Sequence, residues 1–358
     1  MNSFGRIFRV HIFGESHGES VGIVIDGVPA GLPIATDDLM PDLERRKGGK
    51  QKGTTPRQEA DYPFFKSGVF NDKATGAPIT IFFENNNTRS GDYEKQRSFP
   101  RPGHADFVAH QKFGGNEDFR GGGHFSARLT TGLVAAGAIA KKMLLHFTSN
   151  PSPNERDTAP RPGYSLNEVS NAGITIAAAV TAIGGEADLE KGLQKAIDAK
   201  DSVGGLVECI VNGLPAGLGE PFFDSVESHL AHMMFAIPAV KGVEFGTGFA
   251  AAKMFGSQHN DAIEDMSGKT ATNHAGGIVG GITNGNQLVF RLAIKPTAST
   301  PKQQHSLNWE TGQMEDFAIK GRHDLCVALR APVIVEAAAA IALADLMMLE
   351  QRFPRVWQ

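Results

Sequence analysis

Cysteine is scarce in this chain, which holds only two, Cys209 and Cys326. Two cysteines cannot form the disulfide framework of a small secreted domain, so a reducing compartment is expected. A secretory signal is also missing, because Arg6, Arg9 and Glu15 interrupt the apolar run at the start of the chain. These absences predict a cytoplasmic protein.

Long hydrophobic runs are absent as well. The longest stretch without Asp, Glu, Lys or Arg, from Thr270 to Phe290, contains several asparagines and glycines and a histidine, and is too polar to span a membrane. There is no excess of positive charge either, since the formal net charge is −4. General affinity for nucleic acid is therefore not expected.

One internal repeat stands out among the 358 residues. VGIVIDGVPAGL (21–32) and VECIVNGLPAGL (207–218) align without a gap, and each reads as a strand that ends in a Gly/Pro turn. A helical pattern follows each copy, at 37–46 and 224–235. Chance recurrence of a common turn is the alternative, but we favour a single domain over residues 1–358 built of two pseudo-equivalent halves.

The order of the remaining elements predicts an α+β fold. Strands do not alternate regularly with helices, which disfavours a doubly wound parallel sheet. Further helices are expected over 126–147, with Ser126 as its cap, over 188–201, and from near Pro332 onward. Strands are expected at 6–13, 20–26, 78–84, 173–183, 206–212 and 287–295, and loops at 85–103, 148–163 and 296–321.

A basic run, RRKGGKQKGTTPR (45–57), holds six basic residues and no acidic one. Such a run is either a solvated loop or an anion site. It contains no aromatic residue on which bases could stack, so a small anionic ligand fits better than a polynucleotide.

Five of the twelve histidines lie in turns next to glycine or charged residues. Single turn histidines are often merely exposed, but several of them favour a shared polar pocket; they are His17, His104, His124, His274 and His323. Neither His-Glu-x-x-His nor paired Cys-x-x-Cys occurs, and His229 and His232 are expected to face solvent from an amphipathic helix. No metal is therefore predicted.

The segment RGGGHFSAR (120–128) combines backbone freedom with charge. Three glycines let the chain curl before a helix whose first amides would face an anion. Arg120 and Arg128 can add charge-assisted hydrogen bonds to phosphate. The alternative is a glycine-rich turn without a ligand; a Walker A loop and a Rossmann fingerprint are both missing.

Taken together, a set of ordered motifs resembles the chorismate synthase family. The motifs cover nearly the whole chain in the family's order: FGESHG (13–18), RPGHAD (101–106), FRGGGHFSAR (119–128), LPAGLGEP (214–221), VKGVEFGTGF (240–249), TNHAGGIVGG (272–281), KPTAS (295–299) and KGRHDLC (320–326). Each motif alone is weak, but the ordered set is specific.

This resemblance implies an enzyme of the shikimate pathway, a carbon–oxygen lyase that converts 5-enolpyruvylshikimate-3-phosphate into chorismate and phosphate. It implies a trans-1,4-elimination that needs reduced FMN although the reaction has no net redox change, with NADPH as a reductant in some members. It also implies a β–α–β sandwich with internal pseudo-two-fold symmetry, assembled as a homotetramer.

Matching positions carry the expected catalytic roles. His17 matches a histidine beside the substrate phosphate, with Ser16 next to it, and His104 matches a histidine near the flavin. Asp324 matches the carboxylate that is implicated, with flavin N5, in removing the C6 proton. The arginines expected around the phosphates are Arg46, Arg57, Arg101, Arg128 and Arg322.

The resemblance also implies cofactor contacts. The expected flavin contacts are His124, Phe125, Ser126, Pro238, Ala239, Gly280, Lys295, Pro296, Thr297, Ala298, Ser299 and Arg322, and those to NADP are Arg46 and Lys52. This chain departs from common family residues at His124, Phe125, Lys52, Pro238 and Ala298. A non-catalytic binder of phosphate metabolites and a nucleic-acid-binding protein are the alternative classes.

Overall fold

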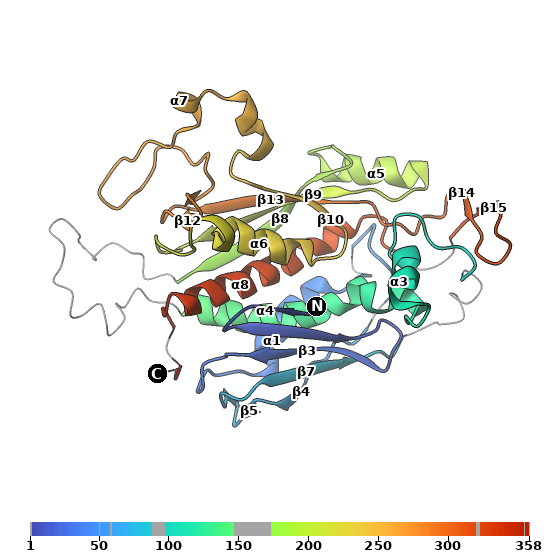
Figure 1. Cartoon of the computed structure of the whole chain (residues 1–358), viewed down its shortest axis with the longest axis horizontal. Coiled ribbons are helices and arrows are strands. Elements are labelled where there is room, and N and C mark those ends of the chain that lie inside the picture. Colours follow the sequence, from blue (N-terminus) through green and yellow to red (C-terminus); the bar gives the residue numbers. More distant parts are fainter. Residues whose placement is uncertain are drawn as a thin grey trace.

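The computed structural model describes residues 2–49, 51–57, 59–87, 97–146, 173–319, 323–353 and 355–357. Two antiparallel sheets form the outer layers, and helices fill the space between them (Figure 1). The predicted α+β class and the β–α–β sandwich are confirmed. The expected loop at 148–163 lies outside the described residues.

The first sheet has five strands in the order β1-β2-β3-β7-β4. Its central strands β3 and β7 are rich in β-branched and aromatic residues, and the inward side chains of Ile23, Ile81 and Phe83 are completely buried. The strands are β1 Ser3–Phe4, β2 Arg9–Gly14, β3 Ser20–Asp26, β7 Ile79–Glu84 and β4 Phe64–Ser67.

The second sheet has four strands in the order β10-β13-β9-β8. Strand β13 alternates buried and half-buried residues along its whole length, as expected for a strand with one face on the core. The strands are β8 Thr175–Ile183, β9 Gly205–Asn212, β10 Val240–Phe245 and β13 Leu288–Ile294.

Helices α1, α4, α6 and α8 lie in the layer between the sheets (Figure 1). Helix α4 packs on β3 and β7, while α8 packs on β8 and β9, and the two helices contact each other. At their contact a side chain on Gly137 would lie 2.2 Å from the Cβ of Ala337, so small residues are needed there. The helices are α1 Thr36–Arg46, α4 Thr130–Leu145, α6 Val226–Phe235 and α8 Ala331–Leu349.

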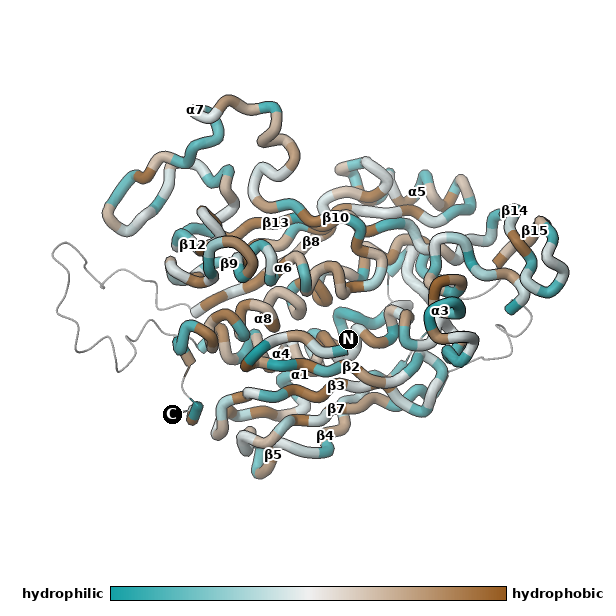
Figure 2. Tube along the Cα trace, in the orientation of Figure 1, coloured by the Kyte–Doolittle hydropathy of each residue, from teal (hydrophilic) through white to brown (hydrophobic). Residues whose placement is uncertain are grey.

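Helix α8 is buried along almost its whole length, and Figure 2 shows its hydrophobic character at the centre of the molecule. The segment Val327–Leu349, which includes it, is long and apolar enough to cross a membrane, yet 89% of its most apolar window is buried inside the protein. A helix that is apolar on all sides and covered by protein is a core helix.

The remaining elements lie at the periphery. Helix α5 covers the outer side of the second sheet near β8 (Figure 1). Helix α3 lies near the glycine-rich turn, where the rings of Phe113 and Phe125 are 6.3 Å apart. They are α3 Asp106–Phe113, α5 Leu189–Ala199, α7 Gly256–His259, the hairpins β5 Val69–Phe70/β6 Lys73–Ala74, β11 Ile278–Val279/β12 Ile282–Thr283 and β14 Gln304–Leu307/β15 Met314–Phe317, and 3₁₀ turns at Arg120–Phe125, Ala127–Leu129, Phe222–Asp224, Gly248–Lys253 and Val327–Arg330.

The two halves of the chain share one order of elements. The series β2, β3, α1, β4, β7, α4 in the first half corresponds to β8, β9, α6, β10, β13, α8 in the second. The matching strands also occupy matching places in their sheets. The repeated turns after β3 and β9 therefore belong to equivalent positions. From this shared order and the common helical layer we propose that residues 1–358 form a single domain of two pseudo-equivalent halves.

Several expected elements differ in detail. The loop expected at 296–321 contains the β14–β15 hairpin, and no strand was expected where β4 and β10 lie. The helices expected to open on Asp37 and Asp224 instead have Ala35 and Ser225 at their N-caps. These differences arise because exposed hairpins and edge strands carry weak hydrophobic patterns.

Candidate active site

A cavity of about 680 Å³ lies where both halves of the chain meet. The end of α1, the glycine-rich turn before α4 and the β10 and β13 ends of the second sheet all border it. Most of the residues expected from the sequence line this cavity: Arg46, Arg57, Arg101, His104, His124, Phe125, Ser126, Arg128, Pro238, Ala239, Lys295, Pro296, Thr297, Ala298, Ser299 and Asp324.

The glycine-rich turn lets two histidines approach the backbone. Gly121 and Gly122 both adopt positive φ, which few other residues tolerate. A Cβ on Gly121 would lie 2.5 Å from the His17 ring, and one on Gly122 would lie 3.0 Å from the His104 ring. The predicted curl of this segment is confirmed, and its function in this structure is to admit these two rings.

His17 and Ser16 lie just behind the cavity wall, on the far side of Gly121, and Arg57 connects them to it. The Arg57 guanidinium donates to the Ser16 hydroxyl at 3.2 Å and to the Ser16 carbonyl at 3.3 Å. Burial, and then the charges of Arg57 and Arg120, lower the pKa of His17 to about 4. His17 is therefore a neutral imidazole near pH 7.

His104 is oriented by Asp106. The His104 Nδ1 lies 2.6 Å from the Asp106 carboxylate, and Arg101 donates to both oxygens of that carboxylate at 2.7 Å. Although burial acts in the opposite direction, the hydrogen bonds from Arg101 and His104 lower the pKa of Asp106. A charged carboxylate requires a proton on Nδ1, which leaves the Nε2 of His104 as the atom available for a ligand.

Asp324 is held from two sides. Its Oδ1 accepts from the Thr55 amide at 2.8 Å, and its Oδ2 accepts from the Arg330 guanidinium at 3.0 Å. The carboxylate lines the cavity and is only 12% exposed. Thr55 belongs to the basic run, so this segment is docked onto the site rather than solvated throughout.

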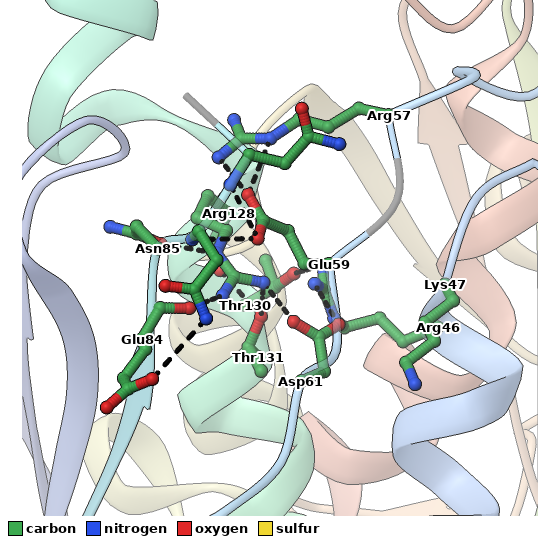
Figure 3. A network of polar contacts seen from close by, with 12 residues as sticks. Arg46, Lys47, Arg57, Glu59, Asp61, Glu84, Asn85, Arg128, Thr130 and Thr131 are labelled. Atoms are coloured by element: carbon green, nitrogen blue, oxygen red, sulfur yellow. Dashed lines mark hydrogen bonds and ion pairs between the residues drawn. The ribbon is translucent and has the colours of Figure 1, made fainter. Parts of the chain in front are cut away.

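Two predicted phosphate ligands, Arg46 and Arg128, share one carboxylate (Figure 3). Asp61 accepts from Arg46 at 3.0 Å and also from Arg128, and all three side chains are at most 4% exposed. Burial alone would raise the pKa of Asp61, but the two guanidinium charges lower it. Burial lowers the pKa of Arg46 to about 10, so it stays charged at neutral pH.

The charge of the cavity favours anionic ligands. Eight lysine and arginine side chains line it, against three carboxylates. Two of these cations, Lys241 and Lys295, have no carboxylate partner among the described residues, and Lys295 donates to the Gly103 carbonyl at 2.8 Å. Burial, and then the charge of Lys241, lower the pKa of Lys295.

The cavity also fits a phosphorylated planar cofactor. The Thr297 hydroxyl, two residues after Lys295, is buried and has no hydrogen-bond partner among the residues that the structure describes. Ala239 holds positive φ beside Lys295, a strain that is common at ligand sites. Part of the cavity wall is apolar and suits an aromatic ring system; it is formed by Phe4, Val10, Ile12, Leu133, Met233, Phe235 and Ile237.

Four expected contacts do not line the cavity. Lys52 is exposed and bonds to Gln194 on α5. Gly280 lies in the turn between β11 and β12, away from the cavity. Ser16 and His17 lie behind Gly121, as described above. Arg322, expected to contact both the phosphates and the flavin, lies outside the described residues.

Sequence reasoning missed several lining residues. Glu59 and Asp61 lie outside the motifs quoted above, and Lys241 lies inside a motif that was matched for other reasons. His323 was expected in the shared polar pocket and does line the cavity. The buried Nε2 of His323 has no hydrogen-bond partner in the described part of the chain. His274, expected in the shared pocket, instead bonds to Thr247 outside it. His232, expected to face solvent, is exposed but lines the cavity.

Stability is expected to fall as the pH drops from about 6.5 to about 4. Burial is the main reason that the pKa values of His17 and His323 are lowered to about 4 in the folded protein. The unfolded chain takes up these protons near pH 6.5, so acid favours unfolding until the folded values are passed. Each pKa shift lowers the free energy of unfolding in acid by at most roughly 3 kcal/mol.

Urea unfolding between pH 7.5 and pH 4.5 measures this effect. His323→Asn should show a shallower loss of stability across that range than the unaltered protein, because one of the two titrating groups is gone. Identical pH dependence in the two proteins would contradict this account of His323.

Comparisons with known proteins agree with the motifs. The family model for chorismate synthase matches residues 8–348. A chorismate synthase of Chitinophaga pinensis is 65% identical over 358 residues, covering 100% of both chains, and one of Dehalococcoides mccartyi is 44% identical over 99% of both. A crystal structure of chorismate synthase superposes with a TM-score of 0.68 at 25% identity, covering 97% of this chain and 93% of that one. This chain belongs to the chorismate synthase family.

Proposed function

We propose that this protein catalyses the trans-1,4-elimination of phosphate from 5-enolpyruvylshikimate-3-phosphate to give chorismate, as a carbon–oxygen lyase of the cytoplasm. This is the last common step of the shikimate pathway to the aromatic amino acids. The observation that carries the proposal is the cationic cavity, which gathers His104, Asp324 and the arginines from motifs that are far apart in the chain. Family membership supports the same reaction.

Different residues would act at the two reacting positions of the substrate, the leaving phosphate and the C6 proton. Negative charge develops on the leaving phosphate, and Arg57, with Ser16 and the neutral His17 behind it, lies where donors can stabilise that charge. The proton leaving C6 needs a base, and Asp324 presents a positioned carboxylate inside the cavity. Protein walls limit the water that would trap a cationic intermediate.

Reduced FMN is the proposed cofactor. Lys295, Thr297 and Lys241 would hold its phosphate, and the apolar wall that includes Phe4 and Ile237 would take its ring. When bound, it supplies electron density to the allylic system from which phosphate departs. Lys295 to Ser299, Pro238, Ala239 and His124 to Ser126 are the proposed contacts, together with Arg322. Gly280, which was expected to contact the flavin, lies away from this cavity and is not among them.

NADPH is proposed as the reductant of the flavin, with Arg46 and Lys52 as its contacts. Arg46 is buried against Asp61, whereas Lys52 is exposed near α5. This separation leaves Lys52 as the more accessible contact for a second nucleotide. The assay described below is run with and without NADPH, and this tests whether NADPH reduces the flavin on this protein.

A homotetramer is the proposed assembly. Large apolar side chains are exposed on the segments around α6 and α7, with Phe222 86% and Phe223 93% exposed. Exposed apolar surface of this kind marks association sites. We do not propose a nucleic-acid partner. In the basic run Arg46 is buried and Arg57 lines the cavity, so neither side chain is presented on the surface to a phosphate backbone.

An anaerobic assay tests the proposed function. With 5-enolpyruvylshikimate-3-phosphate and chemically reduced FMN, we expect chorismate and phosphate in equal amounts, and no product when flavin is left out. FMN should also bind more tightly when the substrate is present. Substrate turnover without flavin, or none with reduced flavin, would contradict the proposal. Turnover with NADPH and oxidised FMN would show that the protein reduces its own cofactor.

A further inference from the structure

Glu59 contacts two parts of the site at once. It lies two residues from both Arg57 and Asp61, lines the cavity and is only 5% exposed at its side chain. Its Oε1 accepts from the Arg57 Nη2 at 2.7 Å and from Nε at 3.1 Å. Its Oε2 accepts from the backbone amides of Asn86 and Asn87 at 3.1 and 3.2 Å. The carboxylate therefore connects Arg57 to the chain that leaves strand β7 (Figure 3).

The neighbouring Nη1/Nη2 edge of the Arg57 guanidinium meets Ser16, and Nη2 donates to both Glu59 and Ser16. Nη1 donates to the Ser16 hydroxyl and Nη2 to the Ser16 carbonyl. A free arginine side chain loses rotamer entropy when it is fixed. Glu59 fixes it before a ligand arrives, and this lowers the entropic cost of binding an anion at that edge.

We propose that Glu59 is a positioning residue, which holds Arg57 against Ser16 so that the guanidinium is preorganised for the phosphate of the substrate. The inference rests on the proposed function, because it takes the ligand to be a phosphate ester. None of the motifs quoted above contains Glu59, and its proposed role follows from its contacts.

Two physical effects of Glu59 have opposite signs, which makes the inference testable. Its negative charge beside the site repels an anion, so neutralising it would tighten binding if the field alone mattered. Its hold on Arg57 favours binding, so neutralising it should weaken binding if positioning dominates. The sign of the change therefore separates the two effects.

Glu59→Gln keeps the size of the side chain and removes the charge. We expect the KM for 5-enolpyruvylshikimate-3-phosphate to rise about tenfold with a smaller change in kcat, since an interaction present before the chemical step is lost. Glu84→Gln is the matched control. It removes one negative charge at the end of β7, close in sequence to the Asn86 and Asn87 amides that Glu59 accepts from, and its exposed carboxylate contacts the Asn86 side chain and not Arg57. Its KM should stay within about twofold of the starting value.

A double-mutant cycle with Arg57→Met tests whether Glu59 acts through Arg57. In the Arg57→Met background, Glu59→Gln should cause no further rise in KM. This double variant also lacks both charges, so it stays informative if Glu59→Gln alone is poorly folded, and thermal midpoints are recorded for each protein.

Three results would overturn the inference: a lower KM in Glu59→Gln, an unchanged KM, or a rise in KM that persists without Arg57. They differ from failure of the proposed function, in which the unaltered protein would form no chorismate. Active wild-type protein with the same KM in Glu59→Gln would contradict the positioning role alone.

Discussion

Asp324→Asn is expected to lower turnover by about 10²–10⁴-fold while the substrate still binds. The substitution keeps the shape of the side chain and removes its basicity, so the C6 proton loses its acceptor. Thr55 and Arg330 orient Asp324 and hold its carboxylate at a fixed place in the cavity. A water molecule is therefore not expected to take over its role as the base. Anaerobic single-turnover measurements with reduced FMN give the rate of the chemical step directly.

Asp316→Asn is the matched control for this experiment. Asp316 is also a carboxylate with a charged or polar partner, His305, but it lies on the exposed β14–β15 hairpin. We expect its turnover to remain near normal. If Asp324→Asn keeps near-normal turnover and is folded, Asp324 is not the base; if its activity falls only in proportion to its stability, the carboxylate serves to brace the segment around Thr55.

Asp61→Asn is expected to destabilise the fold by about 3–5 kcal/mol. Asp61 is the shared partner of Arg46 and Arg128, and its side chain is 1% exposed. Removing its charge leaves two buried guanidinium groups without a counter-charge. Asp61 also adopts positive φ, which asparagine tolerates as well as aspartate, so this variant tests charge and not backbone strain.

Urea unfolding at pH 7 measures the loss, and a second substitution checks its cause. Arg46→Met in the Asp61→Asn background removes one of the unpaired cations and should recover part of the stability. Acid should have the same effect as the substitution. Because the pKa of Asp61 is lowered in the folded protein, its contribution to the free energy of unfolding is fully present above about pH 4. This contribution is lost as the pH falls further. A loss below about 1 kcal/mol would show that water reaches the arginines.

The central elements of the fold were predictable because their patterns are strong. Strand β3 was predicted with its observed bounds, and α1 to within one residue, since a short apolar run and an amphipathic helix have distinct periods. The repeated turns after β3 and β9 have glycines with positive φ at matching positions, Gly27 and Gly31 against Gly213 and Gly217. This agrees with the proposed division into two halves. Helix α3 and strands β4 and β10 were missed, because their residues gain their structure from neighbours rather than from a local pattern.

The sequence by itself determined the chemical groups of the site, because motifs such as RPGHAD and GGGHFSAR fix residue types at short spacing. Only the tertiary structure decided how those groups are paired. Asp61 lies fifteen residues from Arg46 and sixty-seven from Arg128, yet one carboxylate serves both. Glu59 accepts from the Asn86 amide 27 residues away, and Asp324 accepts from the Thr55 amide 269 residues away. Electrostatic pairing depends on the separation of charges in space. A sequence pattern gives only their separation along the chain, so it does not show which charges become neighbours when the sheets and helices pack together.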